Sequence, residues 1–334
     1  MEHEDFVYWY TQIRQICVYV ILPIFVSVGL LVNVVALCVW VFGPKSKSMC
    51  CAIYFAANSA VDFLLLTAPL VWTQSWYKII TPTDFTCKLF VSFYSSCKQL
   101  TTFISAIITV ERSLTILFPL FFQTKDMRKR SKIILIVIVI FQPLIQSMRL
   151  YYEKMVRVKS IDSCVFSNNM IFKVFIVFEN CVTFLIPFAV IVTFNTATVS
   201  TLIKQRFGRD AVFGRQDHVN IFTKLTLLTG MSFVLAYTPW TVLIIHKPFD
   251  LGLSKFIMAI LAEPFYVMLF FNSVMNPIIC IIFCKSVRDD ITYFIKAIAR
   301  RTRWCCTCGR SHSEVSTSNI TLDTTAVETT EITS

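Results

Sequence analysis

Charged residues are scarce in this sequence: they make up 15% of its 334 residues, against roughly 25% in an ordinary soluble domain. Glycine is also scarce, with seven residues, whereas phenylalanine occurs thirty-one times. These absences exclude a soluble, disordered or collagen-like chain, because Phe-rich segments without turn residues are typical of long buried helices. The mean hydropathy of +0.67 agrees with a membrane protein.

Largely uncharged stretches recur along the chain, at residues 15–43, 48–77 (interrupted by Asp62), 99–110, 133–148, 180–203, 225–245 and 264–284. A helix needs about 20 apolar residues to cross the hydrocarbon core of a bilayer. We therefore predict an all-α membrane protein with seven transmembrane helices. The stretch 133–148 is the weakest, and Lys132 and Arg149 are expected to snorkel from its ends.

Basic residues determine the predicted orientation. With the C-terminus inside, nineteen Lys and Arg residues lie in cytoplasmic segments and eight lie outside, as the positive-inside rule requires. The N-terminus is then extracellular, and the first crossing acts as a signal anchor, because Glu2, Glu4 and Asp5 replace the basic region of a signal peptide. The net charge of +11 needs no nucleic-acid partner.

Ionisable residues inside a membrane mark functional sites, and six fall within the predicted helices: Asp62, Lys98, Glu111, Arg112, Glu179 and Glu263. A transporter would show internal repeats and glycine-broken helices, whereas Gly29 and Gly230 are the only glycines within the predicted membrane crossings, since Gly43 ends the first stretch. A membrane enzyme would need a catalytic constellation, whereas the four histidines are scattered over both sides. A receptor is favoured, with a seven-helix transporter as the remote alternative.

Short motifs follow one another in an order that carries a family resemblance. They are Gly29 and Asn33, Asp62, Cys87, the triplet Glu111-Arg112-Ser113, Pro119, Pro187, the Phe233 to Pro239 segment, and Asn272 to Cys280 with Asn276-Pro277. On these residues the chain resembles a class A, rhodopsin-like G-protein-coupled receptor across residues 27–308. The resemblance implies a multi-pass receptor of the plasma membrane, and no enzyme.

The expected organisation has four parts. Residues 1–15 form an extracellular N-terminus, residues 16–284 the seven-transmembrane domain, residues 285–304 a short amphipathic eighth helix on the membrane surface, and residues 305–334 a disordered cytoplasmic tail. The apolar residues of 285–304 recur with helical period. The tail is rich in Ser and Thr, and the resemblance implies receptor kinases and arrestin as its partners.

The resemblance also implies a signalling mechanism. Glu111, Arg112 and Pro119 are expected to meet a heterotrimeric G protein, with anionic membrane lipid near the basic inner loops. Phe233, Tyr237, Pro239, Asn276 and Pro277 form the expected activation switch, in which the sixth helix swings outward about Pro239. Proline suits such a hinge because it removes a backbone hydrogen bond.

A buried carboxylate must be paired, hydrated or protonated. Asp62, Thr101, Asn272, Ser273 and Asn276 are the positions that line the family's interior sodium pocket. Their oxygen atoms suit an allosteric Na⁺, and no other cofactor is required. The alternative is a hydrated hydrogen-bond cluster that satisfies Asp62 without an ion.

The cysteines divide by side of the membrane. Cys87 and Cys164 face the oxidising side in the predicted topology, so a disulfide between them is expected. Cys305, Cys306 and Cys308 face the cytosol after the amphipathic helix, which is the setting of reversible palmitoylation. A zinc site is disfavoured there, because only three thiols are present and no paired spacing accompanies them.

The expected ligand is a neuropeptide. Tyr94 replaces the Asp of the family's amine receptors, and Phe270 replaces the retinal-bearing Lys of opsins. The segment 148–167 is compatible with a β-hairpin lid, which peptide-binding members of the family commonly carry. A small non-peptide or lipid ligand is the alternative. The candidate ligand-binding residues are Tyr94, Lys98, Gln99, Glu179, Trp240, Glu263 and Tyr266.

Two further points stay open at the level of sequence. Lys98 and Glu179 either contact the ligand or pair with each other as a buried salt bridge. Several usual family residues are replaced: the triplet ends in Ser113, Cys280 and Asn195 stand where tyrosines are usual, and Val219 stands where an acidic residue often restrains the triplet Arg. Elevated basal activity is therefore expected.

Overall fold

The computed structural model describes residues 3–49, 51–76, 83–118, 127–158, 161–166, 170–207, 216–249 and 255–311. Its helices and strands are α1 (His3–Gln15), α2 (Leu22–Phe42), α3 (Ala52–Trp76), α4 (Asp84–Leu117), α5 (Met127–Tyr152), β1 (Glu153–Val158), β2 (Ile161–Phe166), α6 (Met170–Asn180), α7 (Ile186–Phe207), α8 (Gln216–Phe249), α9 (Lys255–Phe283) and α10 (Lys285–Ser311). Pro119 lies outside the described residues, as does the tail beyond Ser311.

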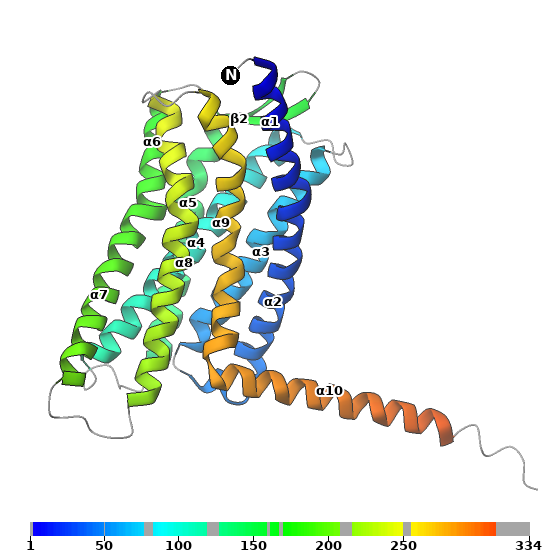
Figure 1. Ribbon diagram of the computed structural model, residues 1–334, viewed down its shortest axis with the longest axis vertical. Coiled ribbons are helices and arrows are strands. Elements are labelled where there is room, and N and C mark those ends of the chain that lie inside the picture. The colour runs from blue at the N-terminus through cyan, green and yellow to red at the C-terminus, as the bar shows by residue number, and fades with distance from the viewer. Residues whose placement is uncertain are drawn as a thin grey trace, which may run out of the picture. The chain divides into compact units, whose positions relative to one another are not determined.

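Seven helical segments among the described residues are long and apolar enough to cross a membrane. They run over Val7–Phe42, Ala52–Leu70, Asp84–Leu117, Lys129–Tyr151, Lys173–Lys204, Lys224–His246 and Ile257–Phe283. The predicted seven-helix bundle is thereby confirmed, with the helices side by side in Figure 1. The first segment begins at Val7, inside the part assigned from sequence to the N-terminal segment.

Two of the seven segments contain a π-helical turn just before a proline. Ile16–Ile21 joins α1 to α2 ahead of Pro23, and Cys181–Leu185 joins α6 to α7 ahead of Pro187. Proline cannot donate the hydrogen bond that its helical position requires, and a π-helical turn is one way in which a continuous helix absorbs that loss. These prolines adjust the path of their helices without ending them.

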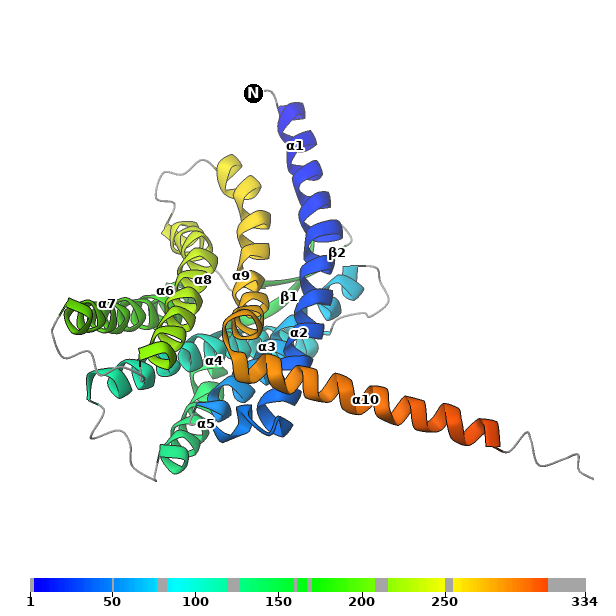
Figure 2. The same ribbon diagram turned by 60° about the horizontal axis from the view of Figure 1, so that its bottom comes forward.

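The helix α4 runs through the bundle and contacts α3, α5, α7 and α8 (Figure 2). Its polar residues are consequently buried: Thr101 and Thr102 are completely enclosed, as is Gln99. Close approach at the first helix depends on Gly29, where a Cβ atom would lie 2.7 Å from a methyl group of Leu66 and 2.9 Å from one of Val274. Thus α2 packs tightly against α3 and α9.

The strands β1 and β2 pair as an antiparallel hairpin, with Glu153 opposite Phe166 and Val158 opposite Ile161. The predicted hairpin is confirmed, over a shorter range than 148–167, because α5 continues to Tyr152. The hairpin lies at the end of the bundle where α1 begins (Figure 1). Both strands contact α4.

The opposite end of the bundle is closed by contacts between the first inner loop and the start of α10. Residues 1–291 form one compact unit and residues 292–334 a second. Within the first unit, the carboxylate of Asp290 accepts hydrogen bonds from the backbone N–H of Lys45 at 3.2 Å and of Ser46 at 2.7 Å. The neighbouring Asp289 accepts one from the ammonium of Lys45 at 2.6 Å.

The helix α10 begins at Lys285, as predicted, but continues past Trp304 to Ser311. Its exposed apolar residues include Tyr293, Ile295 and Ile298. Cys305, Cys306 and Cys308 lie in its last turns. An exposed apolar set of this kind is what a helix on a membrane surface presents to lipid.

Candidate functional site

The inner end of α4 carries the Glu111-Arg112-Ser113 triplet. Glu111 accepts hydrogen bonds from the Tyr54 hydroxyl at 2.7 Å and the Ser131 hydroxyl at 3.3 Å. Arg112 lies against the buried thiol of Cys51, with which it hydrogen-bonds. These contacts connect α4 to α3 and α5. The side chains of Asp217 and Val219 lie outside those that the structure describes.

Ser113, which replaces the usual tyrosine of the triplet, contributes to the contact between α4 and α7. Its hydroxyl donates to the Phe194 carbonyl at 3.2 Å and accepts from the Thr198 hydroxyl at 2.8 Å. Both Ser113 and Thr198 are buried. The substitution therefore places a small hydrogen-bonded pair where the family usually has an aromatic ring.

Two residues of the predicted switch in α8, Phe233 and Tyr237, belong to a column of stacked aromatic rings. The Phe233 ring stacks on Tyr237 with centroids 4.9 Å apart, and on Phe184 of the fifth segment at 5.8 Å. Phe233 is fully buried and Tyr237 is 2% exposed. Pro239 follows two residues later. The stacked rings therefore lie within two turns of the point in α8 where Pro239 lacks a backbone N–H.

The N-terminal half of α8 and the facing part of α7 line an open groove of about 450 Å³, with Asn195 on α7 and Gly230 on α8 among its residues. A Cβ atom at Gly230 would lie 2.7 Å from the side-chain nitrogen of Asn195. The side chain of Asn195 thus packs directly against the backbone of α8 at Gly230.

Asp62 is completely buried and lies at the centre of a polar cluster. It accepts hydrogen bonds from the Thr101 hydroxyl at 2.5 Å and the Asn58 amide at 2.6 Å. The structure therefore unites Asp62 with Thr101, as predicted, and adds Asn58. Asn58 lies four residues before Asp62, so helical spacing alone would have placed it on the same face.

Three residues of α9 complete the predicted sodium-binding set, and they differ in their contacts. The hydroxyl of Ser273 and the side-chain oxygen of Asn276 are buried without a hydrogen-bond partner. The side-chain oxygen of Asn272 accepts a hydrogen bond from Ser232 of α8 at 3.1 Å. Ser273 and Asn276 lie near the Asp62 carboxylate, whereas the side-chain oxygen of Asn272 is engaged by Ser232.

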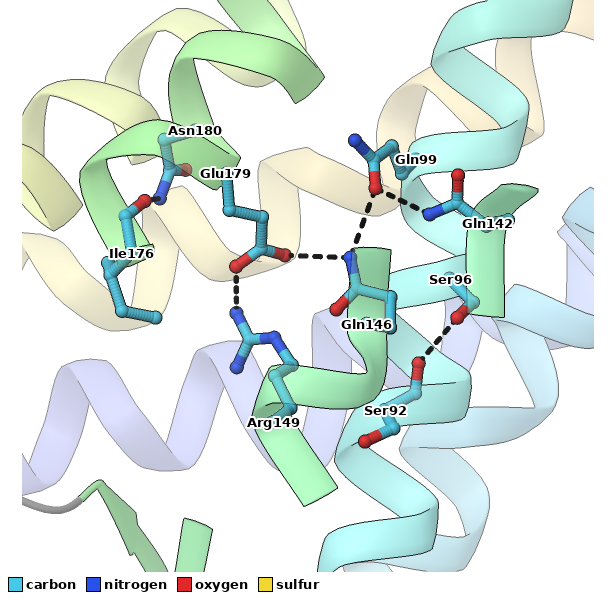
Figure 3. Close-up of polar contacts among 9 residues, drawn as sticks. All are labelled: Ser92, Ser96, Gln99, Gln142, Gln146, Arg149, Ile176, Glu179 and Asn180. Carbon is cyan, nitrogen blue, oxygen red and sulfur yellow. Dashed lines mark hydrogen bonds and ion pairs between the residues drawn. The ribbon is translucent and has the colours of Figure 1, made fainter. Parts of the chain in front are cut away.

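A second polar network lies between α4, α5 and α6 (Figure 3). Glu179, 1% exposed, accepts hydrogen bonds from Arg149 and, at 3.3 Å, from the amide of Gln146. The Gln146 amide also donates to the Gln99 carbonyl at 3.0 Å, and the Gln142 amide donates to the same oxygen. Two adjacent turns of α5 are thereby joined to α4 and α6.

This network corrects the expectation about Arg149 and decides against one of the two alternatives left open for Glu179. Arg149 does not snorkel from the end of its helix: it is 5% exposed and forms an ion pair with Glu179 inside the bundle. Glu179 is consequently paired with Arg149, and not with Lys98. The missed signal is the spacing of Gln142, Gln146 and Arg149, which places three polar side chains on one face of an otherwise apolar helix.

The remaining ligand candidates lie on α4, α8 and α9. The Tyr266 ring contacts Trp240 at 5.7 Å and Phe270 at 5.3 Å, and Tyr94 contacts Phe270 at 6.4 Å. Glu263 forms an ion pair with Arg14 of α1 at 3.8 Å. Tyr94, Trp240 and Tyr266 thus form one aromatic group. Glu263 joins the first and last membrane segments.

Cys87 lies near the start of α4, where Thr83 and Thr86 form a capping box. Its backbone N–H donates to the Thr83 carbonyl at 2.9 Å, and its sulfur is disulfide-bonded. Cys164 lies on β2, and this strand contacts α4. The side chain of Cys164 lies outside those described, as do the side chains of Cys305, Cys306 and Cys308.

The sequence matches the family profile described as 7 transmembrane receptor (rhodopsin family) over residues 32–280, which is well over half of the chain. The protein therefore belongs to the rhodopsin family of seven-transmembrane receptors. No curated protein matches the chain closely enough to count as a relative. Family membership defines it as a multi-pass signalling receptor of the plasma membrane, with a ligand and a G protein as partners.

Proposed function

We propose that the protein is a receptor for an extracellular neuropeptide, with its N-terminus outside the cell, and that it activates heterotrimeric G proteins through outward motion of α8. The observation that carries the proposal is the construction of α8. Phe233 and Tyr237 are buried and stacked, and an open groove of about 450 Å³ lies between the N-terminal half of α8 and α7. Motion about Pro239 would use that space, and the G protein would then contact Arg112.

The β1–β2 hairpin supports a peptide ligand, because a hairpin lid leaves the outer end of the bundle open to a long, polar molecule. The aromatic group of Tyr94, Trp240 and Tyr266 would pack against the peptide. A disulfide between Cys87 and Cys164 would fasten β2 to α4. A small non-peptide or lipid ligand is the alternative.

The coupling role predicts that Arg112→Ala abolishes signalling. In ligand-free cells, the wild-type receptor is expected to raise calcium or cyclic AMP signals above an empty-vector control, because the usual acidic partner of the triplet Arg is replaced by Val219. Arg112→Ala is expected to return these signals to the control level. Arg300→Ala removes an exposed arginine on α10 and is the matched control at equal surface expression.

A wild-type receptor with signals equal to the empty vector would contradict the proposed basal activity. If Arg112→Ala kept every response that a neuropeptide library elicits from the wild type, the proposed coupling role would be wrong. The Arg300→Ala receptor must signal like the wild type in these experiments. This control shows that removal of an arginine does not by itself impair the receptor.

The cluster around Asp62 supports an allosteric sodium site. Asp62, Thr101, Ser273 and Asn276 would hold the ion, which would supply a compensating positive charge for the buried carboxylate. We expect sodium chloride to raise the Tm of the purified receptor above its value in choline chloride, since a ligand that binds only the folded state stabilises it. Asp62→Asn should remove that difference, whereas equal Tm values in both salts would refute the site.

The C-terminal segment supports regulation from the cytosol. The exposed apolar residues of α10 would lie on the membrane surface, with Cys305, Cys306 and Cys308 palmitoylated nearby. Phosphorylation of the Ser- and Thr-rich tail by receptor kinases would add negative charge for arrestin to bind. Metabolic labelling with a palmitate analogue, compared with a variant carrying Ser at all three cysteines, tests the first of these modifications.

A further inference from the structure

Two buried cations share a single buried carboxylate in the outer half of the bundle. Lys98 is 8% exposed, Arg149 is 5% exposed and Glu179 is 1% exposed. Figure 3 shows the carboxylate of Glu179 directed at the guanidinium of Arg149 and at the amide of Gln146. Both of its oxygen atoms are thereby engaged without Lys98.

Lys98 makes no hydrogen bond and no ion pair with any of the residues that the structure describes. Among the described charged residues, Glu179 attracts the ammonium group and Arg149 repels it. Glu179 thus offsets part of the charge of Lys98 without contacting it, because its carboxylate is bonded to Arg149 and Gln146. One turn earlier on the same face of α4 lies Tyr94, which belongs to the aromatic group.

The charges of the described side chains in this cluster do not balance. Lys98 and Arg149 each contribute +1 and Glu179 contributes −1, so the described residues leave one positive charge in excess. The adjacent Gln99 adds an amide nitrogen that is buried without an acceptor. An uncompensated buried charge is costly, and such cost is characteristic of sites that await a ligand.

We propose that Lys98 binds a carboxylate group of the receptor's ligand, with the Gln99 amide as a second donor. A carboxylate accepts hydrogen bonds only and carries a single negative charge, which equals the excess of the cluster. A phosphate carries nearly two charges and is usually bound by several arginines. The inference rests on the proposed function, since it assigns the ligand class to the same outer site.

The first test needs no ligand. Lys98→Met is expected to raise the Tm of the purified receptor by about 2–4 °C, because it removes an uncompensated buried charge while keeping the chain length. Lys88→Met is the matched control on the same helix: Lys88 is partly exposed and paired with Asp84 at 2.8 Å, and its replacement should leave the Tm unchanged. A lower Tm for Lys98→Met would show that Lys98 is already paired in the protein and would overturn the inference.

The second test uses paired probes. One set contains short peptides with a C-terminal carboxylate or the corresponding carboxamide, and the other contains small carboxylic acids and their amides. The wild-type receptor is expected to bind a carboxylate probe about 10- to 100-fold more tightly than its amide. In Lys98→Met this preference should disappear while binding of the amide is unchanged.

The outcomes separate this inference from the proposed function. Carboxylate preference confined to the small acids would support the role of Lys98 and refute the neuropeptide proposal. Peptides that bind equally well as acid and amide would support the receptor and overturn the role of Lys98. Failure of every carboxylate probe to bind better than its amide would overturn it as well.

Discussion

Glu179→Gln is expected to lower the free energy of unfolding of the receptor by about 3–5 kcal/mol, the usual cost of removing one partner of a buried ion pair. Glutamine keeps the size of the side chain, but only one of its two terminal atoms accepts hydrogen bonds, so either Arg149 or Gln146 loses its acceptor. The loss would therefore combine one broken buried hydrogen bond with the removal of the carboxylate charge beside Lys98 and Arg149. Thermal unfolding in detergent and surface expression measure the effect.

A second substitution separates charge from shape in this experiment. Lys98→Met in the Glu179→Gln background removes one of the two unbalanced cations, so part of the lost Tm should return. The double mutant should be more stable than the Glu179→Gln single mutant. If Glu179→Gln unfolded at the wild-type temperature, the ion pair with Arg149 would have no structural importance.

Asp290→Ala is expected to lower the free energy of unfolding by about 2–4 kcal/mol, since it leaves backbone donors of the first inner loop without their acceptor. Asp290 is 1% exposed and binds the N–H groups of Lys45 and Ser46. Its carboxylate approaches so closely that a Cβ atom at Gly43 would lie 2.4 Å from it.

Asp289→Ala is the matched control, because the two neighbours carry the same charge and differ in burial. Asp289 forms an exposed ion pair with Lys45 at 2.6 Å, and exposed pairs contribute little. The Lys45 ammonium lowers the pKa of Asp289, and Asp289 raises the pKa of Lys45. This pair is therefore intact at neutral pH, and is lost when acid protonates Asp289 below its ordinary pKa or alkali deprotonates Lys45 above its own.

If Asp289→Ala and Asp290→Ala lowered the free energy of unfolding equally, negative charge at the start of α10 would account for the stabilisation, and the buried hydrogen bonds of Asp290 would contribute nothing further. Thermal unfolding of both variants at neutral pH distinguishes these results.

The membrane segments and the family were predictable from the sequence because both depend on local features. Apolar stretches of the required length report a bilayer crossing directly. The triplet at Arg112 and the Asn276-Pro277 motif carry the family through their order along the chain, which the profile match over residues 32–280 confirms. The hairpin was also predictable, because its alternating residues lie close together in the chain.

Partner choice among buried polar residues was not predictable. Glu179 pairs with Arg149, thirty residues away, and not with Lys98. Arg149 looks like a terminal, lipid-facing residue when its helix is considered alone, yet the packing of α5 against α4 buries it, and it pairs with Glu179 of α6. Asn272 likewise accepts a hydrogen bond from Ser232 of the neighbouring helix α8. Such choices depend on helix rotation and packing, to which a single helix gives no guide.

The scarcity of charge and glycine in this sequence determined by itself that the chain is a bundle of membrane helices, because burial in lipid tolerates few ionisable groups and favours continuous helices. Which of the few remaining charges compensate one another was decided only by the tertiary structure. Three helices bring Lys98, Arg149 and Glu179 together in a medium that does not screen charge, and their geometry allows one ion pair. The excess charge at Lys98 follows from that packing.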